Sequence, residues 1–212
     1  MKDGDSFDVQ KAVAYLRSAD PVLAALMDRA GPYAAPRRSD PYAALVRAIL
    51  YQQLAGAAAA SIQKKFFALY STDDVPPSPA QILETTDEQF RSVGVSRQKA
   101  GYLRDLAMHI VDGRLDLAAL PSLPDEEVIK RLVAVKGLGE WTAHMFLMFH
   151  LGRPDVLPVG DLGVRNGMRI AYDLPEMPAA SAAREIGAAW APYRSVGSWY
   201  MWRAAATITP EG

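Results

Sequence analysis

The chain has 212 residues, of which 23 are Lys or Arg and 24 are Asp or Glu, and it contains no cysteine. Without cysteine, the protein has no disulfide bond, no thiolate zinc site, no cysteine-ligated iron–sulfur cluster and no cysteine nucleophile. Because the charges nearly balance, binding to a nucleic acid requires a local basic surface rather than a high overall charge.

The N-terminal part of the chain gives few structural signals. Its first residues lack the apolar segment of a signal peptide, and no run of about 18 apolar residues follows, so we expect a cytoplasmic protein without a membrane span. One amphipathic stretch, at residues 9–16, indicates a helix. We expect residues 1–40 to form a helical extension and residues 41–212 to form the main domain.

The main domain opens on a clear helix start. Asp40 followed by Pro41 is typical of an N-cap and a first-turn proline. This pair predicts a helix over residues 42–51, and a second helix is expected over residues 57–69. Alanine, the best helix former, is abundant along the chain, which favours helical structure in general.

Three further helices in the middle of the chain are marked by their caps. The segments SPAQ at 78–81 and TDEQ at 86–89 both fit the capping-box pattern, and each predicts a short helix. Ser96 is a candidate N-cap for a longer helix over residues 97–111, which Gly113 ends.

The last third of the chain continues the helical pattern. A helix is expected to begin at Pro124 or Asp125 and to end near Val135. Residues 141–151 are apolar on almost every side, which is typical of a buried helix. Further helices are expected over residues 161–171, 181–190 and 195–207. The predicted fold class is therefore all-α.

The turn VKGLG at residues 135–139 lies between two of these helices. Its glycines allow backbone conformations with positive φ, and Leu138 is expected to pack inward. The main-chain N–H groups of such a turn and of the next helix form a site suited to a phosphate, although an ordinary helix stop followed by a turn explains the same residues. A dinucleotide fingerprint is disfavoured, because no strand precedes the turn and Thr142 replaces the third glycine.

Four segments follow one another in the order of a known family's motifs. They are LVRAILYQQLAGAAA, LVAVKGLGEWTAHMFLMF, LPVGDLGVRNG and APYRSVGSWYMWRA. Together they resemble the helix-hairpin-helix DNA glycosylase superfamily, and in particular its 3-methyladenine DNA glycosylase II branch. The resemblance implies two α-helical lobes that flank a DNA-binding cleft. Because only about 40 residues precede the shared region, the chain resembles a compact form without the N-terminal β domain of longer members.

Asp161 is the candidate catalytic residue that the resemblance implies. Its position also fits a helix N-cap, and the two roles are compatible. Breaking an N-glycosidic bond builds positive charge on the sugar, which a nearby carboxylate stabilises while it orients or deprotonates the attacking water. Alkylated bases are cationic and leave readily, so a second catalytic acid is not required.

The residues that would hold an everted base also come from the resemblance. Trp141 and Trp202 match pocket tryptophans of the family, although core packing is the alternative for both. Met145 and Leu162 stand where close relatives have tyrosines, so they are expected to line a less aromatic pocket. Bifunctional relatives have a lysine at the position of Trp141, which predicts a monofunctional enzyme without AP-lyase activity.

The contacts with duplex DNA are expected in three places. In the family, one residue fills the gap that the everted base leaves, and Gln53 matches it when the sequences are aligned without a gap. If the alignment is shifted by one residue, Leu54 takes this role. The alternative role for Gln53 is to cap the next helix. The segment 91–104 has four basic residues and no acidic one, and it forms either a phosphate contact or a solvated face. In and after the hairpin turn, the candidate DNA-binding residues are Lys136, Gly137, Gly139 and Thr142.

No cofactor is expected for catalysis. The resemblance implies a structural Na⁺ or K⁺ at the hairpin, bound by the main-chain carbonyls of Val133, Val135 and Leu138. The predicted function is hydrolysis of alkylated bases from double-stranded DNA by a monomer in base excision repair. The alternative is a non-catalytic protein that binds bent or damaged DNA through the same hairpin.

Overall fold

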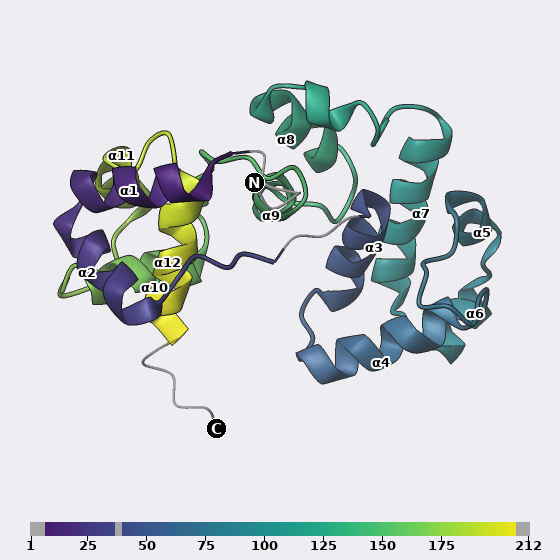
Figure 1. Cartoon of the computed structure of the whole chain (residues 1–212). Helices are drawn as coiled ribbons and strands as arrows, with labels where there is room; N and C mark the ends of the chain where they lie inside the picture. The colour runs from purple at the N-terminus through teal and green to yellow at the C-terminus, as the bar shows by residue number, and fades with distance from the viewer. Residues whose placement is uncertain (1–6, 37–39, 207–212) are drawn as a thin grey trace. The chain divides into compact units, whose positions relative to one another are not determined.

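The computed structural model describes residues 7–36 and 40–206. In these ranges the chain forms twelve α-helices and one short 3-10 helix, η1, and it contains no strand (Figure 1). The prediction of an all-α fold is confirmed. None of the helices in the described ranges is both long and apolar enough to cross a membrane.

The helices belong to two compact units. Unit 1 combines Met1–Arg37 with Leu147–Gly212, and unit 2 is Arg38–Phe146. The N-terminal helices therefore group with the last part of the chain. The boundary between an extension and a main domain at residue 40 stays a prediction.

Unit 2 is organised around its longest helix, α7 (Arg97–Val111), which packs against α3, α5 and α6. Leu103 and Leu106 on α7 are fully buried, as are Phe66 and Phe90, whose ring centroids lie 5.4 Å apart. The other elements of the unit are α3 (Pro41–Tyr51), α4 (Gly56–Phe67), α5 (Pro79–Glu84), α6 (Asp87–Ser92), η1 (Leu120–Ser122), α8 (Asp125–Val133) and most of α9 (Glu140–Phe149).

The caps predicted in unit 2 are confirmed. The Asp40 side chain accepts hydrogen bonds from the first turn of α3, and Ser96 accepts one from Lys99 N at the start of α7. Capping boxes are present at 78–81 and 86–89, where each glutamine also bonds back to the N-cap residue. These starts were predictable because a cap acts within four residues of chain.

Unit 1 is built on a close pair of helices, α10 (Leu162–Ala171) and α12 (Arg194–Ala206). A Cβ atom at Gly167 would lie 2.0 Å from the carbonyl oxygen of Met201, so only glycine allows this approach. The buried core includes Leu16, Leu23 and Trp190. The remaining helices are α1 (Val9–Ala19), α2 (Pro21–Ala30), the end of α9 and α11 (Ala180–Ala188).

The N-terminal residues form two helices where the sequence predicted one. Asp20 accepts hydrogen bonds from Val22 N and Leu23 N, and Pro21 occupies the first turn of α2. This is the same Asp-Pro signal that correctly predicted α3. The second helix was therefore predictable from the sequence Asp20-Pro21.

Asp20 also connects α2 to the rest of unit 1. Its carboxylate, 6% exposed, accepts a hydrogen bond from the Tyr172 hydroxyl and a 2.9 Å bond from Trp190 Nε1. Burial, with the hydrogen bond to Asp20, raises the pKa of Tyr172 well above its usual value, so the hydroxyl stays a donor. Because this buried carboxylate accepts hydrogen bonds from α2, Tyr172 and Trp190, it stabilises the packing of α2 in unit 1.

Replacement of Asp20 by asparagine is expected to lower the free energy of unfolding by about 2 kcal/mol, because when its one oxygen caps α2 its NH₂ group faces the N–H of Trp190 and cannot accept from it. The cap of α2 is retained, since asparagine caps as well as aspartate. The control is Asp28→Asn, which removes only an exposed ion pair with Arg17. Chemical denaturation measures both variants, and equal stabilities would contradict this role of Asp20.

Candidate functional site

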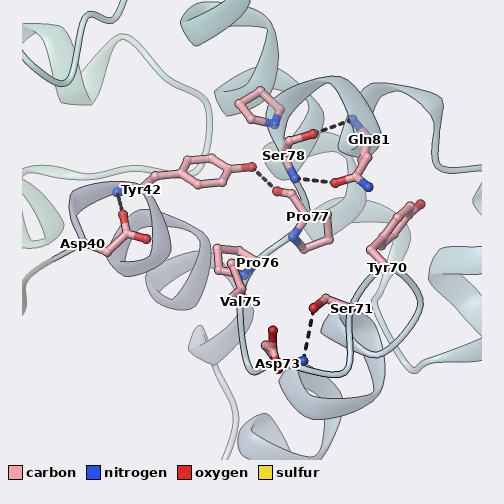
Figure 2. Close-up of a pocket in the computed structure, with 11 residues that line it drawn as sticks. Asp40, Tyr42, Tyr70, Ser71, Asp73, Val75, Pro76, Pro77, Ser78 and Gln81 are labelled. Carbon is pink, nitrogen blue, oxygen red and sulfur yellow. Dashed lines mark hydrogen bonds between the residues drawn. The ribbon is translucent and has the colours of Figure 1, made fainter.

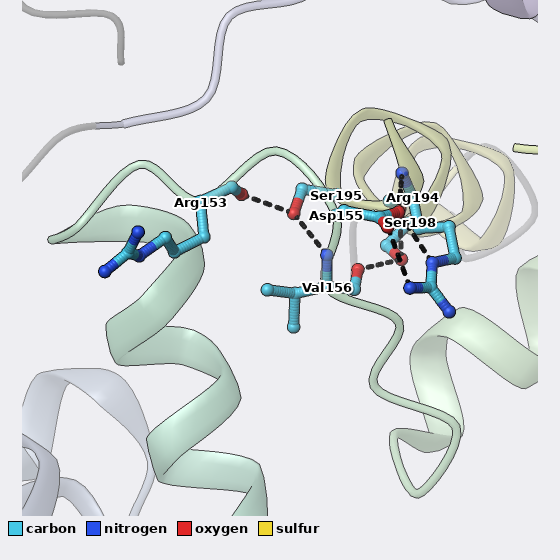
Figure 3. A network of polar contacts seen from close by, with 6 residues as sticks. All are labelled: Arg153, Asp155, Val156, Arg194, Ser195 and Ser198. Atoms are coloured by element: carbon cyan, nitrogen blue, oxygen red, sulfur yellow. Dashed lines mark hydrogen bonds and ion pairs between the residues drawn. The ribbon is translucent and has the colours of Figure 1, made fainter. Parts of the chain in front are cut away.

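The loop that leads into α10 is tied to the first residues of α12 (Figure 3). Ser195 Oγ donates to the carbonyl oxygen of Arg153 at 2.6 Å and accepts from Val156 N at 3.0 Å. Arg194 makes a two-bond contact with Asp155, with distances of 2.6 and 2.8 Å. This irregular loop is therefore held in one conformation by the helix that packs on α10.

Asp161 ends this loop and caps α10. Its Oδ1 accepts a hydrogen bond from Val164 N at 2.7 Å, which confirms the N-cap interpretation. The same oxygen accepts a second bond, at 2.8 Å, from Nε1 of Trp202 on α12. The half-buried carboxylate thus has a fixed orientation at the N-terminus of α10.

Trp202 reaches Asp161 because Gly163, which lies against both side chains, has no side chain of its own. A Cβ atom at Gly163 would lie 2.8 Å from Trp202 Cδ1 and 3.0 Å from Asp161 Oδ1. The indole also packs on Phe149, with ring centroids 5.9 Å apart and planes tilted by 34°. Leu162, the next residue after Asp161, is 65% exposed.

The hairpin turn between α8 and α9 has the expected conformation at its first glycine. Gly137 has a φ of +85°, and a Cβ atom there would lie 2.3 Å from the Tyr102 ring. Leu138 is 3% exposed, so the predicted inward packing is confirmed. Lys136 N donates to Asp105 Oδ2 at 2.8 Å. Gly139 does not adopt a positive φ, so only one of the two glycines uses this freedom.

Helix α9, which follows the turn, is buried or half-buried along its length except at its first two residues. Ala143 and Leu147 are fully buried and Thr142 is 9% exposed, whereas Met145 is half-buried. Trp141 is 53% exposed. The expectation of a helix buried on every side is therefore wrong at its first turn, where an aromatic ring faces solvent.

The loop between α3 and α4 contains both candidates for the residue that enters the base stack. Gln53 is exposed and has a φ of +55°, and Leu54 is 40% exposed. The preceding residue, Gln52, donates from Nε2 to the carbonyl oxygen of Gly137 at 2.6 Å. Both candidates therefore project from a loop that is attached to the hairpin turn.

The comparisons with known proteins agree with this geometry. The family described as "HhH-GPD superfamily base excision DNA repair protein" matches residues 46–192. The chain is also similar to DNA-3-methyladenine glycosylase 1 of Schizosaccharomyces pombe, with 34% identity over 91% of this chain and 86% of that protein. The chain belongs to the HhH-GPD superfamily, within its family of 3-methyladenine DNA glycosylases.

Two solved structures match almost the whole chain. One is the Schizosaccharomyces pombe 3-methyladenine DNA glycosylase in complex with abasic DNA, with a TM-score of 0.80, 34% identity, and coverage of 91% of this chain and 95% of that one. The other is a DNA-3-methyladenine glycosidase from Bacillus halodurans, with a TM-score of 0.85, 37% identity, and coverage of 94% and 91%. The predicted resemblance to this superfamily is confirmed.

The main-chain carbonyls that we expect to bind a cation at the hairpin belong to the last turn of α8 and to the residues after it. A helix C-terminus carries carbonyls without intrahelical partners and a partial negative charge, which suit a cation. Val135 O accepts from Leu138 N at 3.1 Å, and a carbonyl oxygen has a second lone pair for an ion. Val135 O is therefore able to contribute one ligand to a Na⁺ or K⁺ ion. In the described ranges, no group of three His, Asp or Glu side chains could hold a metal ion.

The basic segment at residues 91–104 is partly used inside unit 2. Lys99 Nζ donates to a carbonyl in the last turn of α3 at 2.6 Å. Arg104 pairs with Asp87 at 2.6 Å. Arg91 and Arg97 line a pocket of about 350 Å³ at the start of α7. Two of the four predicted basic groups thus hold the fold together rather than form an open basic face.

A second pocket in unit 2, of about 510 Å³, lies between the start of α3 and the loop before α5 (Figure 2). The Tyr42 side chain lines this pocket, and its hydroxyl donates to the carbonyl oxygen of Pro77 at 2.7 Å. Burial raises the pKa of this hydroxyl, and the nearby Asp40 carboxylate raises it further. The pocket contains none of the predicted site residues.

Three residues at these sites were not predicted from the sequence. Gly163 admits the Trp202 indole, Tyr102 supports the hairpin glycine, and Gln52 joins the hairpin to the α3–α4 loop. The motif LVRAILYQQLAGAAA includes Gln52, but its partner lies 85 residues further along the chain. No local pattern indicates a contact at that separation.

Proposed function

We propose that this protein hydrolyses the N-glycosidic bond of alkylated bases of the 3-methyladenine type in double-stranded DNA and leaves an abasic site. The observation that carries the proposal is the Asp161 carboxylate, held by Trp202 and by the N-terminus of α10. Similarity to 3-methyladenine DNA glycosylases over most of the chain supports it, and the complex of one such relative with abasic DNA supports DNA as the partner.

In the proposed mechanism, Asp161 acts on the sugar rather than on the base. The bond between C1′ and the base nitrogen breaks, and its electron pair leaves with the cationic alkylated base, which becomes neutral. The carboxylate stabilises the positive charge on the sugar, and water then adds to C1′ and gives up its proton to Asp161 or solvent. Because Trp202 and Val164 hold the same oxygen, the carboxylate needs no reorientation during the reaction.

The bases are proposed to leave the stack and to bind against apolar and aromatic side chains. Trp141 in unit 2 and Trp202 in unit 1 each offer an indole surface, and an electron-poor base is attracted to such a surface. Met145 and Leu162 complete the proposed set. Trp141 is 53% exposed, so its side chain is accessible to a base.

DNA is proposed to be held mainly through one phosphate at the hairpin turn. Gly137, Gly139 and Thr142 lie at or beside the N-terminus of α9, whose main-chain N–H groups suit a phosphate. The exposed Lys136 is proposed to contribute its side-chain charge, because its own N–H is bonded to Asp105. A Na⁺ or K⁺ ion on the carbonyls of Val133, Val135 and Leu138 would add positive charge there. The predictions of a monomer and of a cytoplasmic location stay predictions.

No strand cleavage is expected when the protein acts on methylated DNA. Trp141 occupies the position of the lysine that forms a Schiff base in bifunctional relatives, and indole cannot form one. End-labelled DNA treated with the protein is therefore expected to break only after alkali or heat. A covalent protein–DNA adduct trapped by borohydride would contradict this prediction.

Identification of the released bases tests the proposed function directly. Purified protein is incubated with duplex DNA that has been treated with a methylating agent, and the soluble bases are separated by chromatography. We expect 3-methyladenine to appear with the wild-type protein and not with heat-inactivated protein. Tight binding to abasic duplex without release of any methylated base would instead favour the non-catalytic DNA-binding protein.

A further inference from the structure

The hydrogen bond between Gln52 and Gly137 connects two parts of unit 2 with different tasks in the proposed function. Gly137 belongs to the turn that we propose binds a DNA phosphate. Gln52 directly precedes Gln53 and Leu54, the two candidates for the residue that enters the base stack. The bond is 2.6 Å long and joins residues 85 positions apart.

Both ends of this bond are attached to helix α7. On the hairpin side, the Tyr102 ring supports Gly137, and the Asp105 carboxylate accepts from Lys136 N at 2.8 Å. On the loop side, Lys99 donates to a carbonyl in the last turn of α3 at 2.6 Å, and burial lowers the pKa of this lysine. The Gln52 side chain closes a ring of contacts that runs from α7 through the hairpin and the loop to α3.

The loop itself is weakly held by its own main chain. The N–H groups of Gln52 and Leu54 reach the carbonyls of Ile49 and Tyr51 at 3.4 Å, which is long for a hydrogen bond. Gln53 has a φ of +55°, a left-handed conformation that is unfavourable for a residue with a Cβ atom. A loop of this kind keeps one conformation only if something outside it holds it, and the Gln52 side chain makes that contact.

We propose that Gln52 is a positioning residue for base eversion, which sets the distance between the phosphate-binding turn and the residue that replaces the everted base. This inference rests on the proposed function. Eversion costs stacking and pairing energy. The everted state is populated only if the replacing side chain enters the gap while the phosphate is held. A loop free to move relative to the turn fills that gap for a smaller fraction of the time.

Gln52→Met removes the donor and keeps the length and flexibility of the side chain. The matched control is Gln89→Met, which also removes one glutamine side-chain bond to the main chain of unit 2, at the capping box of α6. Two substrates separate eversion from chemistry. One is a duplex with a single 3-methyladenine paired with thymine, and the other has the same strand annealed opposite an abasic analogue, where the lesion is unpaired.

We expect Gln52→Met to lower the single-turnover rate on the paired lesion by about tenfold, the loss that corresponds to one hydrogen bond. On the unpaired lesion the loss is expected to shrink to about twofold or less, since eversion there costs little. Affinity for an abasic duplex and the activity of Gln89→Met are expected to stay close to wild type. Equal losses on both substrates, or no loss on either, would overturn the proposal.

A fluorescence measurement keeps this inference separate from the proposed function. A 2-aminopurine base placed beside the target nucleotide brightens when its neighbour leaves the stack. We expect the wild type and Gln89→Met to increase the fluorescence of the lesion duplex, and Gln52→Met to increase it much less. If the wild type everts the base but releases none, the proposed function fails while the role of Gln52 holds. An equal increase with all three proteins would overturn the role of Gln52.

Discussion

Asp161→Asn is expected to lower the rate of base release from methylated DNA by about 1000-fold, the largest effect that we predict. The substitution removes the negative charge that the sugar needs as its bond to the base breaks. It keeps the side-chain oxygen that accepts from Val164 N and from Trp202 Nε1, so α10 stays capped and the indole stays in place. The variant therefore separates the chemical role of Asp161 from its structural role.

Three measurements on Asp161→Asn decide between these roles. Single-turnover base release gives the chemical step, binding to an abasic duplex gives DNA affinity, and thermal unfolding gives stability. We expect the last two to be nearly unchanged, because phosphate contacts lie elsewhere and the cap is preserved. Wild-type turnover in this variant would show that Asp161 is an N-cap only, and the mechanism proposed above would be wrong.

Trp202→Phe is expected to lower the single-turnover rate by about 10- to 100-fold, the range for a lost hydrogen bond to a charged group. Phenylalanine keeps an aromatic surface against Phe149 but has no N–H for Asp161. The carboxylate then loses one of the two donors on Oδ1 and samples orientations that do not face the sugar. Because this loss acts on the transition state, the rate constant should fall more than the substrate affinity.

Trp199→Phe is the matched control for this prediction. Trp199 lies on the same helix and packs edge-on against Tyr33 and Tyr200, with centroids 5.1 and 4.9 Å apart. We expect it to react at nearly the wild-type rate, even if its stability falls. If Trp202→Phe raised KM and left kcat unchanged, Trp202 would line the base pocket without positioning Asp161.

The two largest predictions depend on contacts of different range. The bond from Asp161 to Val164 spans three residues and belongs to a helix start, so it could be predicted from the sequence. The bond from Trp202 to the same oxygen spans 41 residues. This bond requires α12 to pack on α10, and it requires the space that Gly163 leaves for the indole. No local sequence pattern indicates that these two helices meet or that Gly163 faces Trp202.

The exposure of individual side chains was harder to predict from the sequence than the positions of helices and loops. Residues 141–151 are so apolar that burial on every side was the natural expectation, yet Trp141 is 53% exposed. Conversely, Lys99 and Arg104 lie in a basic segment that could have been a DNA-binding face, yet both hold unit 2 together. Periodicity indicates which residues are apolar or charged, but not which partner covers or pairs with them.

Helix starts, the all-α class and the hairpin turn were all predictable from the sequence, because caps, prolines and glycines act on main-chain groups within a few residues. The family relationship was predictable for a similar reason, since its motifs are short and follow one another in order. The orientation of the Asp161 carboxylate and the attachment of the α3–α4 loop to the hairpin were not. Each depends on helices that meet only after the chain has folded. The bond from Trp202 also depends on Gly163, which leaves room for the indole to reach Asp161.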